Sequence, residues 1–147
     1  MISRRTVLSG GIAATAATVA GPRARAAATP GVTAATLKIG NTMPYSGPAS
    51  AYSSVGKADS AFFKWVNDQG GVGGRKIDFL SYDDGYSPPK TVEQVRRLVE
   101  QDQVDFLFHT LGTPTNSAIE RYLNQHQVPQ LFVATGADKW GNYKEYP

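Results

Sequence analysis

Hydroxyl and aromatic side chains capable of binding a small ligand occur where two apolar runs of the sequence end. Tyr45, Ser46 and Tyr52 follow the first of these runs, and Thr113 and Thr115 follow a later one. Ligands of open α/β sheets bind outside the carboxyl ends of the strands, which is the predicted position of both segments. Thr113 also heads a predicted helix, where its hydroxyl and the N–H groups of the first turn would suit an anion. These residues therefore predict the binding of a small ligand with an anionic group.

Catalytic and metal-binding chemistry has much weaker support in the sequence. Asp83 and Asp84 form one acidic pair without a third ligand or an activated partner, so we expect them to cap the loop before Ser87. His109 and His126 belong to no cluster with metal-ligand spacing and have no nucleophile beside them, so a structural role is expected. The sequence thus predicts neither an enzyme nor a cofactor or metal site.

Alternating apolar runs and helical patterns predict an α/β fold with a parallel sheet. The four expected strands are Thr36–Met43, Lys76–Tyr82, Val104–Thr110 and Val128–Ala134. Three helices are expected between them. The first ends at Gly70-Gly71, the second opens at Ser87-Pro88-Pro89 and the third opens at Thr113-Pro114.

Apolar residues recur at helical spacing in the first of these helices and predict its buried face. The residues of that stripe are Val55, Ala58, Phe62, Trp65 and Val66. We expect the aromatic residues of this helix, Phe62, Phe63 and Trp65, to lie in the hydrophobic core.

The first 26 residues have the features of an export signal. Arg4-Arg5 precedes an uncharged, Ala-rich stretch, and Ala24-Arg25-Ala26 offers a cleavage pattern of small residues. The paired arginines favour the twin-arginine route, with an ordinary secretory signal as the alternative. The apolar stretch is shorter than the ~20 residues that span a bilayer, so no membrane anchor is expected. Residues 27–35 are expected to be a flexible leader, and the mature protein is expected in the periplasm.

The charge of the mature chain excludes one class of partner. Eleven basic and twelve acidic side chains remain from residue 27 onward, for a net charge of −1, although the complete sequence carries +3. No basic stripe with interleaved aromatic residues remains to contact phosphates. We therefore expect no nucleic-acid partner.

Several short motifs in a fixed order carry a resemblance to a known family. They are Ser46-Gly47-Pro48 with Tyr52, Asn67-x-x-Gly70-Gly71-x-x-Gly74-Arg75, Tyr82-Asp83-Asp84 with Pro88-x-Lys90, and Val128-Pro129. Together they resemble the periplasmic substrate-binding proteins of branched-chain amino acid (Leu/Ile/Val) transporters, which have the type I periplasmic binding fold. The resemblance covers residues 36–140 and implies a Rossmann-like first lobe.

The family fold implies two lobes joined by a hinge, with the ligand clamped between them. Residues 36–147 match only part of the first lobe, so the resemblance implies an incomplete lobe and an absent second lobe. A chain of this extent, with an unfinished sheet edge, is expected to fold poorly and bind weakly on its own.

The resemblance also implies which loops meet the ligand. The loop after the first strand would contribute Tyr52, and the loop after the third would bind the carboxylate through Gly112, Thr113 and Thr115. The loop after the fourth would contribute Ala134, Thr135 and Gly136. Pro114 removes one N–H donor and Gly136 stands where relatives can carry a hydroxyl, which leaves room for a carboxylate other than an α-amino acid.

These features together predict an extracytoplasmic solute receptor for an ATP-driven (ABC) importer. Its expected ligand is a small amphipathic carboxylate, with branched-chain amino acids first and aromatic or aliphatic carboxylates second. Its expected partner is the membrane permease of the transporter. Two alternatives remain: a ligand-sensing domain of a receptor, and an α/β enzyme with catalytic groups beyond Pro147.

Overall fold

A computed structural model describes residues 29–142 and residue 144, and it contains one parallel sheet. The strands are β1 (Thr36–Met43), β2 (Lys76–Asp83), β3 (Phe106–Phe108) and β4 (Gln130–Leu131), in the order β2-β1-β3-β4. This architecture confirms the predicted α/β fold with a parallel sheet. The export signal predicted for residues 1–26 lies outside the described residues.

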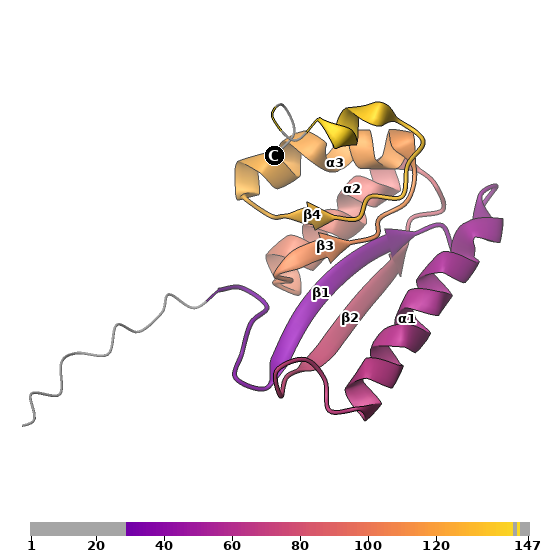
Figure 1. Ribbon diagram of the computed structural model, residues 1–147. Helices are drawn as coiled ribbons and strands as arrows, with labels where there is room; N and C mark the ends of the chain where they lie inside the picture. Colours follow the sequence, from indigo (N-terminus) through magenta and orange to yellow (C-terminus); the bar gives the residue numbers. More distant parts are fainter. Residues whose placement is uncertain (1–28, 143, 145–147) are drawn as a thin grey trace, which may run out of the picture.

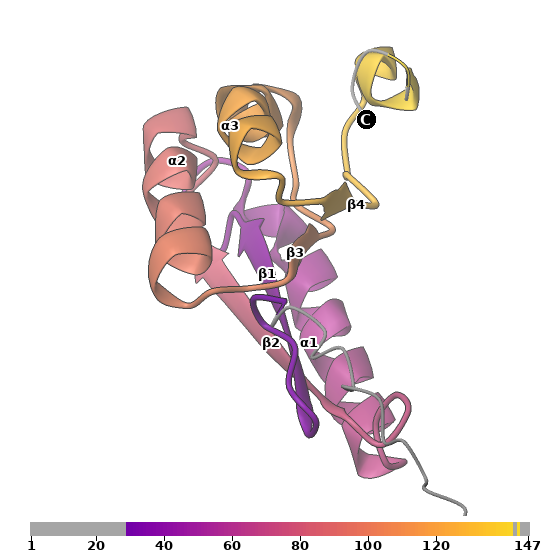
Figure 2. The same cartoon turned by 90° about the vertical axis from the view of Figure 1, so that its left-hand side faces the viewer.

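Helices cover both faces of the sheet, as Figures 1 and 2 show. One face carries α1 (Ser53–Asp68), and the other carries α2 (Pro88–Arg96) and α3 (Thr113–His126). The short helical segments η1 (Ser50–Tyr52) and η2 (Arg97–Gln101) extend α1 and α2, and η3 (Asp138–Gly141) follows β4. No helix in the described part of the chain is long and apolar enough to cross a membrane.

The hydrophobic core lies between the sheet and the pair formed by α2 and α3. Its buried residues are Val95, Leu98, Val104, Leu107, Ile119 and Leu123. Packing there is close because Gly40 of β1 has no side chain. A Cβ atom at Gly40 would lie 2.9 Å from Cδ2 of Leu107 and 3.2 Å from the methyl groups of Leu98.

The last two strands are shorter than the sequence predicts. β3 pairs with β1 only at Phe106 and Leu107. After Leu107, the side chain of Asn41 on β1 takes the place of the backbone hydrogen bonds between the two strands. Nδ2 of the buried Asn41 donates hydrogen bonds to the carbonyl oxygens of Phe108 (2.8 Å) and His109 (3.0 Å). His109 itself has a φ of +55°, which ends the extended backbone.

The predicted buried face of α1 is wrong, because the helix is rotated about its axis relative to the prediction. Phe62 and Trp65 are 57% and 59% exposed, whereas Phe63 is buried with its ring centroid 4.9 Å from that of Phe79. The face toward the sheet includes Asp59, whose carboxylate lies 2.9 Å from Nδ1 of His109. A polar residue on the inner face and aromatic residues on the outer face explain why apolar spacing alone selected the wrong side.

Candidate functional site

A hollow of about 380 Å³ lies where β1, β3 and β4 end and the following loops begin. It is lined by Tyr52, Val55, Tyr86, Leu111, Gly112, Thr113, Ala134, Thr135 and Gly136. Six of these residues were candidates from the sequence: Tyr52, Gly112, Thr113, Ala134, Thr135 and Gly136. The fold thus brings together residues that are up to 84 positions apart in the chain.

The polar end of the hollow is built by two loops that meet. Oγ1 of Thr113 lies 2.8 Å from Oγ1 of Thr135, and the Gly112 N–H donates to the Ala134 carbonyl at 2.9 Å. Gly112 is the N-cap of α3, so no side chain caps this helix end. The first N–H groups of a helix have no intrahelical acceptor, and here they adjoin two hydroxyl groups. Such an arrangement can bind a carboxylate by hydrogen bonds and by the positive end of the helix dipole.

Three other candidate residues do not line this hollow. The buried Thr115 donates its hydroxyl to the backbone carbonyls of Leu111 and Gly112. The Tyr45 hydroxyl lies 2.5 Å from that of Ser81. Ser46 donates both its N–H (3.0 Å) and its hydroxyl (2.6 Å) to the Asp83 carboxylate. Their polar groups therefore hold the surrounding loops in place.

The acidic pair after β2 caps its loop, as the sequence predicts. Asp83 accepts from the Gly85 N–H at 3.0 Å and from Nζ of Lys90 at 3.1 Å, in addition to Ser46. Asp84 is buried and accepts from the Tyr86 N–H at 2.9 Å and from the Thr91 hydroxyl at 3.0 Å. No group of three metal-ligating side chains occurs within the described residues.

Burial and hydrogen bonding shift the pKa values of Asp83 and Asp84 in opposite directions. Partial burial alone would raise the pKa of Asp83, but the hydrogen bonds from Ser46, Lys90 and Gly85 outweigh it and hold this pKa below its usual range. Burial raises the pKa of Asp84, against the hydrogen bonds from Tyr86 and Thr91.

Asp83 should therefore make stability depend on pH. Because its pKa is lower in the folded state, its contribution is fully present above the ordinary aspartate pKa of about 3.9 and is lost progressively as the pH falls from there toward the lower folded-state pKa. We expect Asp83→Asn to lower the melting temperature at pH 7. The difference in melting temperature between Asp83→Asn and the wild type should become smaller as the pH falls from about 5 to about 3.

Asp105→Asn is a control for which the pH dependence of stability should have the opposite sign, because burial raises the pKa of Asp105. A buried carboxyl of this kind loses its contribution as the pH rises through its folded-state pKa. Relative to the wild type, Asp105→Asn should therefore become more stable as the pH rises. If the melting temperatures of Asp83→Asn and the wild type differ by the same amount from pH 7 to pH 3, the lowered pKa of Asp83 is contradicted.

Sequence analysis missed three residues of the hollow: Val55, Tyr86 and Leu111. Tyr86 lies in a turn from Asp84 to Ser87, whose N–H donates to the Asp84 carbonyl at 3.0 Å. Both central residues, Gly85 (φ +58°) and Tyr86 (φ +60°), have left-handed backbone, as in a type I′ turn. The Asp-Gly pair directly after a strand was the sequence signal for this turn.

Asp59 and His109 join two of the elements that carry the site. Asp59 lies one turn after Val55 on α1, and His109 lies two residues before Leu111. Their contact fixes α1, which follows Tyr52, against the end of β3. This arrangement agrees with the structural role predicted for His109.

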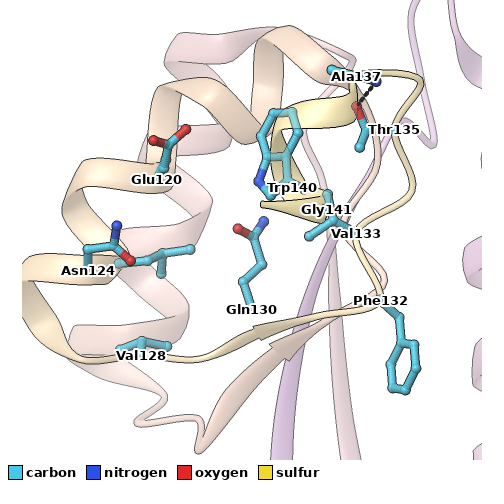
Figure 3. Close-up of a pocket in the computed structure, with 11 residues that line it drawn as sticks. Glu120, Asn124, Val128, Gln130, Phe132, Val133, Thr135, Ala137, Trp140 and Gly141 are labelled. Atoms are coloured by element: carbon cyan, nitrogen blue, oxygen red, sulfur yellow. Dashed lines mark hydrogen bonds between the residues drawn. The ribbon is translucent and has the colours of Figure 1, made fainter. Parts of the chain in front are cut away.

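A second hollow, of about 420 Å³, lies along the edge of β4 and is shown in Figure 3. Its lining comes from α3, β4 and η3, and it includes Glu120, Asn124, Gln130 and Trp140. Gln130 is already bound to Thr110 and Asn116 through its Nε2, and Glu120 is paired with Lys139. This hollow lies beside the end of β4 alone, whereas the first hollow lies at the ends of several strands, so the first hollow is the better candidate site.

Comparison with known proteins identifies the family of the chain. A family profile described as "Periplasmic binding protein" matches residues 36–146. The chain belongs to the periplasmic binding protein family. No curated protein matches the sequence.

Solved structures of other periplasmic binding proteins share the fold. A fatty acid transporter substrate-binding protein from Thermomonospora curvata is 31% identical, with a TM-score of 0.61 over 74% of this chain and 27% of its own. A solute-binding protein from Rhodopseudomonas palustris, in complex with 3,4-dihydroxybenzoic acid, is 26% identical, with a TM-score of 0.62 over 76% of this chain and 30% of its own.

The likeness extends to the branched-chain amino acid binding proteins. The transporter substrate-binding protein of Streptococcus pneumoniae, in complex with isoleucine, is 20% identical, with a TM-score of 0.68 over 76% of this chain and 32% of its own. At this identity the comparison shows the shared fold. The chain spans about a third of the length of these periplasmic binding proteins.

Proposed function

We propose that the protein is an extracytoplasmic solute receptor that binds a small carboxylate with an apolar body for an ABC importer. The observation that carries this proposal is the hollow between the β1, β3 and β4 loops, where two hydroxyl groups meet the uncapped start of α3. Family membership supports the same function, because other members are transporter substrate-binding proteins.

The carboxylate would lie at the polar end of the hollow. Thr113 would donate its hydroxyl to one carboxylate oxygen, and the N–H groups of the first turn of α3 would donate to the other. Thr135 would orient the Thr113 hydroxyl through their 2.8 Å contact. The apolar body would then lie against Tyr52, Val55 and Leu111, where burial of its surface supplies most of the affinity.

The transport cycle of the proposal follows from the two-lobe fold. A second lobe would close over the hollow by a hinge, and the closed form would dock on the membrane permease. Branched-chain amino acids are the first ligands to test, as expected from the sequence motifs. Aromatic carboxylates are the second, because two tyrosines, Tyr52 and Tyr86, line the hollow.

A thermal-shift screen of the complete mature protein tests this proposal. A ligand that binds only the native state raises the melting temperature by mass action. We expect a rise with leucine, isoleucine, valine or an aromatic carboxylate. Thr113→Val should weaken the binding of that ligand about tenfold, because a hydrogen bond to a charged group is lost.

Ser117→Ala provides the control, since Ser117 is exposed on the same helix and does not line the hollow. It should leave the dissociation constant unchanged. The proposal fails if no carboxylate in either set raises the melting temperature. If Thr113→Val binds the ligand as tightly as the wild type, the proposed position of the carboxylate at Thr113 is wrong.

A further inference from the structure

We propose that Tyr86 is a specificity-determining residue of the candidate site and that it favours carboxylates with a planar aromatic body. This inference rests on the proposed function, because it concerns the ligand of the same hollow. Tyr86 reaches the hollow from the loop after β2, whereas the other lining residues come from the loops after β1, β3 and β4 and from α1. It therefore forms a separate wall.

The backbone of Tyr86 is held from behind. Its N–H donates to Oδ1 of Asp84, which is buried and also accepts from Thr91. The residue occupies a left-handed conformation that the Asp84–Ser87 turn imposes. The turn therefore fixes the position from which the Tyr86 side chain reaches the hollow.

The ring of Tyr86 is fixed as well, because it packs directly on the start of α3. A Cβ atom at Gly112 would lie 2.5 Å from Cε2 and 3.1 Å from Cζ of the ring. The aromatic wall thus stands beside the helix end that would bind the carboxylate. Whatever is bonded to that carboxylate would meet this ring first.

Tyr52 supplies a second aromatic wall, and the two rings do not contact each other within the described part of the chain. The space between them can therefore take a ligand. A flat ring gains the electrostatic preference for offset or edge-to-face packing on each tyrosine, and a saturated or branched body does not. The expected preference is about tenfold in the dissociation constant.

Benzoate and cyclohexanecarboxylate test the inference, because they differ in planarity and aromaticity and share the carboxylate and the number of ring carbons. Their dissociation constants would be measured by calorimetry on the complete mature protein. We expect benzoate to bind about tenfold more tightly than cyclohexanecarboxylate. Tyr86→Leu should reduce this ratio to about threefold, because the Tyr52 ring remains, and Tyr86→Phe should preserve it.

The ratio separates a role in specificity from a role in folding, since a variant that is merely less stable weakens both ligands alike. Tyr52→Leu gives a second test that is safe for the fold, because Tyr52 is 58% exposed. It should also lower the ratio. Equal binding of the two ligands to the wild type, or an unchanged ratio in Tyr86→Leu, would overturn the inference.

Leucine distinguishes this inference from the proposed function. If leucine binds and benzoate does not, the receptor function stands and the role of Tyr86 is refuted. If neither benzoate, cyclohexanecarboxylate nor any amino acid binds, both fail together.

Discussion

Replacing Gly112 by alanine should destabilise the complete mature protein by about 3 kcal/mol. Gly112 has a φ of +105°, a backbone conformation that residues with a Cβ atom rarely adopt. The added Cβ atom would also lie 2.5 Å from the Tyr86 ring and 2.6 Å from Oγ1 of Thr115. The strain and the overlap add to each other, because the Thr115 hydroxyl is buried and bonded to the loop backbone and cannot move aside. Urea unfolding would show the loss as a lower midpoint.

Gly136→Ala is the matched control for this prediction. Gly136 lines the same hollow, but a Cβ atom there would have no neighbour within 4 Å. Its replacement should change the free energy of unfolding by less than about 0.5 kcal/mol. Equal urea midpoints for Gly112→Ala and Gly136→Ala would contradict the close packing of the Tyr86 ring on α3.

Replacing Asn41 by leucine should also cost about 3 kcal/mol of stability. Nδ2 of Asn41 donates to two backbone carbonyls at the end of β3, and its Oδ1 accepts from the Ser81 hydroxyl at 2.7 Å. Leucine fills a similar volume but removes the hydrogen bonds to both half-buried carbonyls and leaves the Ser81 hydroxyl with Tyr45 alone. Each buried polar group left unpaired costs on the order of 1 kcal/mol or more.

The effect of Asn41→Leu should be visible in both stability and binding. The carbonyls that it releases belong to Phe108 and His109, which lead into the loop with Gly112 and Thr113. Asn124→Leu is the control, because Asn124 is exposed on α3 and should tolerate the change. A loss below about 1 kcal/mol for Asn41→Leu would show that the network is dispensable.

The sequence predicted the elements of the fold well because their signals are local. Apolar runs located all four strands, and the Thr113-Pro114 pair located the start of α3 at Thr113. The length of β3 was wrong because its end depends on a distant side chain, and β4 ends early at the left-handed backbone of Phe132 (φ +55°). Asn41 binds carbonyls that are 67 and 68 positions away, and no local pattern contains that information.

The inner face of α1 was wrong for a similar reason. Asp59 faces the sheet because it meets His109, 50 positions away. Phe62 and Trp65 look like core residues in the sequence, yet they contact each other on the exposed face, with ring centroids 5.9 Å apart. Apolar spacing cannot distinguish two aromatic faces of one helix unless the partner of the polar residue is known.

The candidate site was only partly predictable from residue types. Thr113 and Thr115 are chemically identical, and successive residues of a helix differ by about 100° in direction. Which of them lines the hollow depends on how the chain enters α3 at Gly112, which the sequence does not encode locally. The Thr113 hydroxyl reaches Thr135, and the Thr115 hydroxyl reaches the backbone of its own loop. Tyr86 was missed because its turn was recognised only as a loop.

Residues that hold the loops and residues that line the hollow are largely different in this fold, although Thr135 does both, since its Oγ1 accepts from the Ala137 N–H at 3.2 Å. Asn41, Asp83, Asp84 and Thr115 bind the loop backbones from behind, and Tyr52, Tyr86, Thr113 and Thr135 present their side chains in front. A combinatorial library restricted to the front set should therefore yield a high fraction of folded variants. Directed evolution of the lining residues could then change the ligand specificity, to give a biosensor for new small acids, without compensating substitutions in the residues that hold the loops.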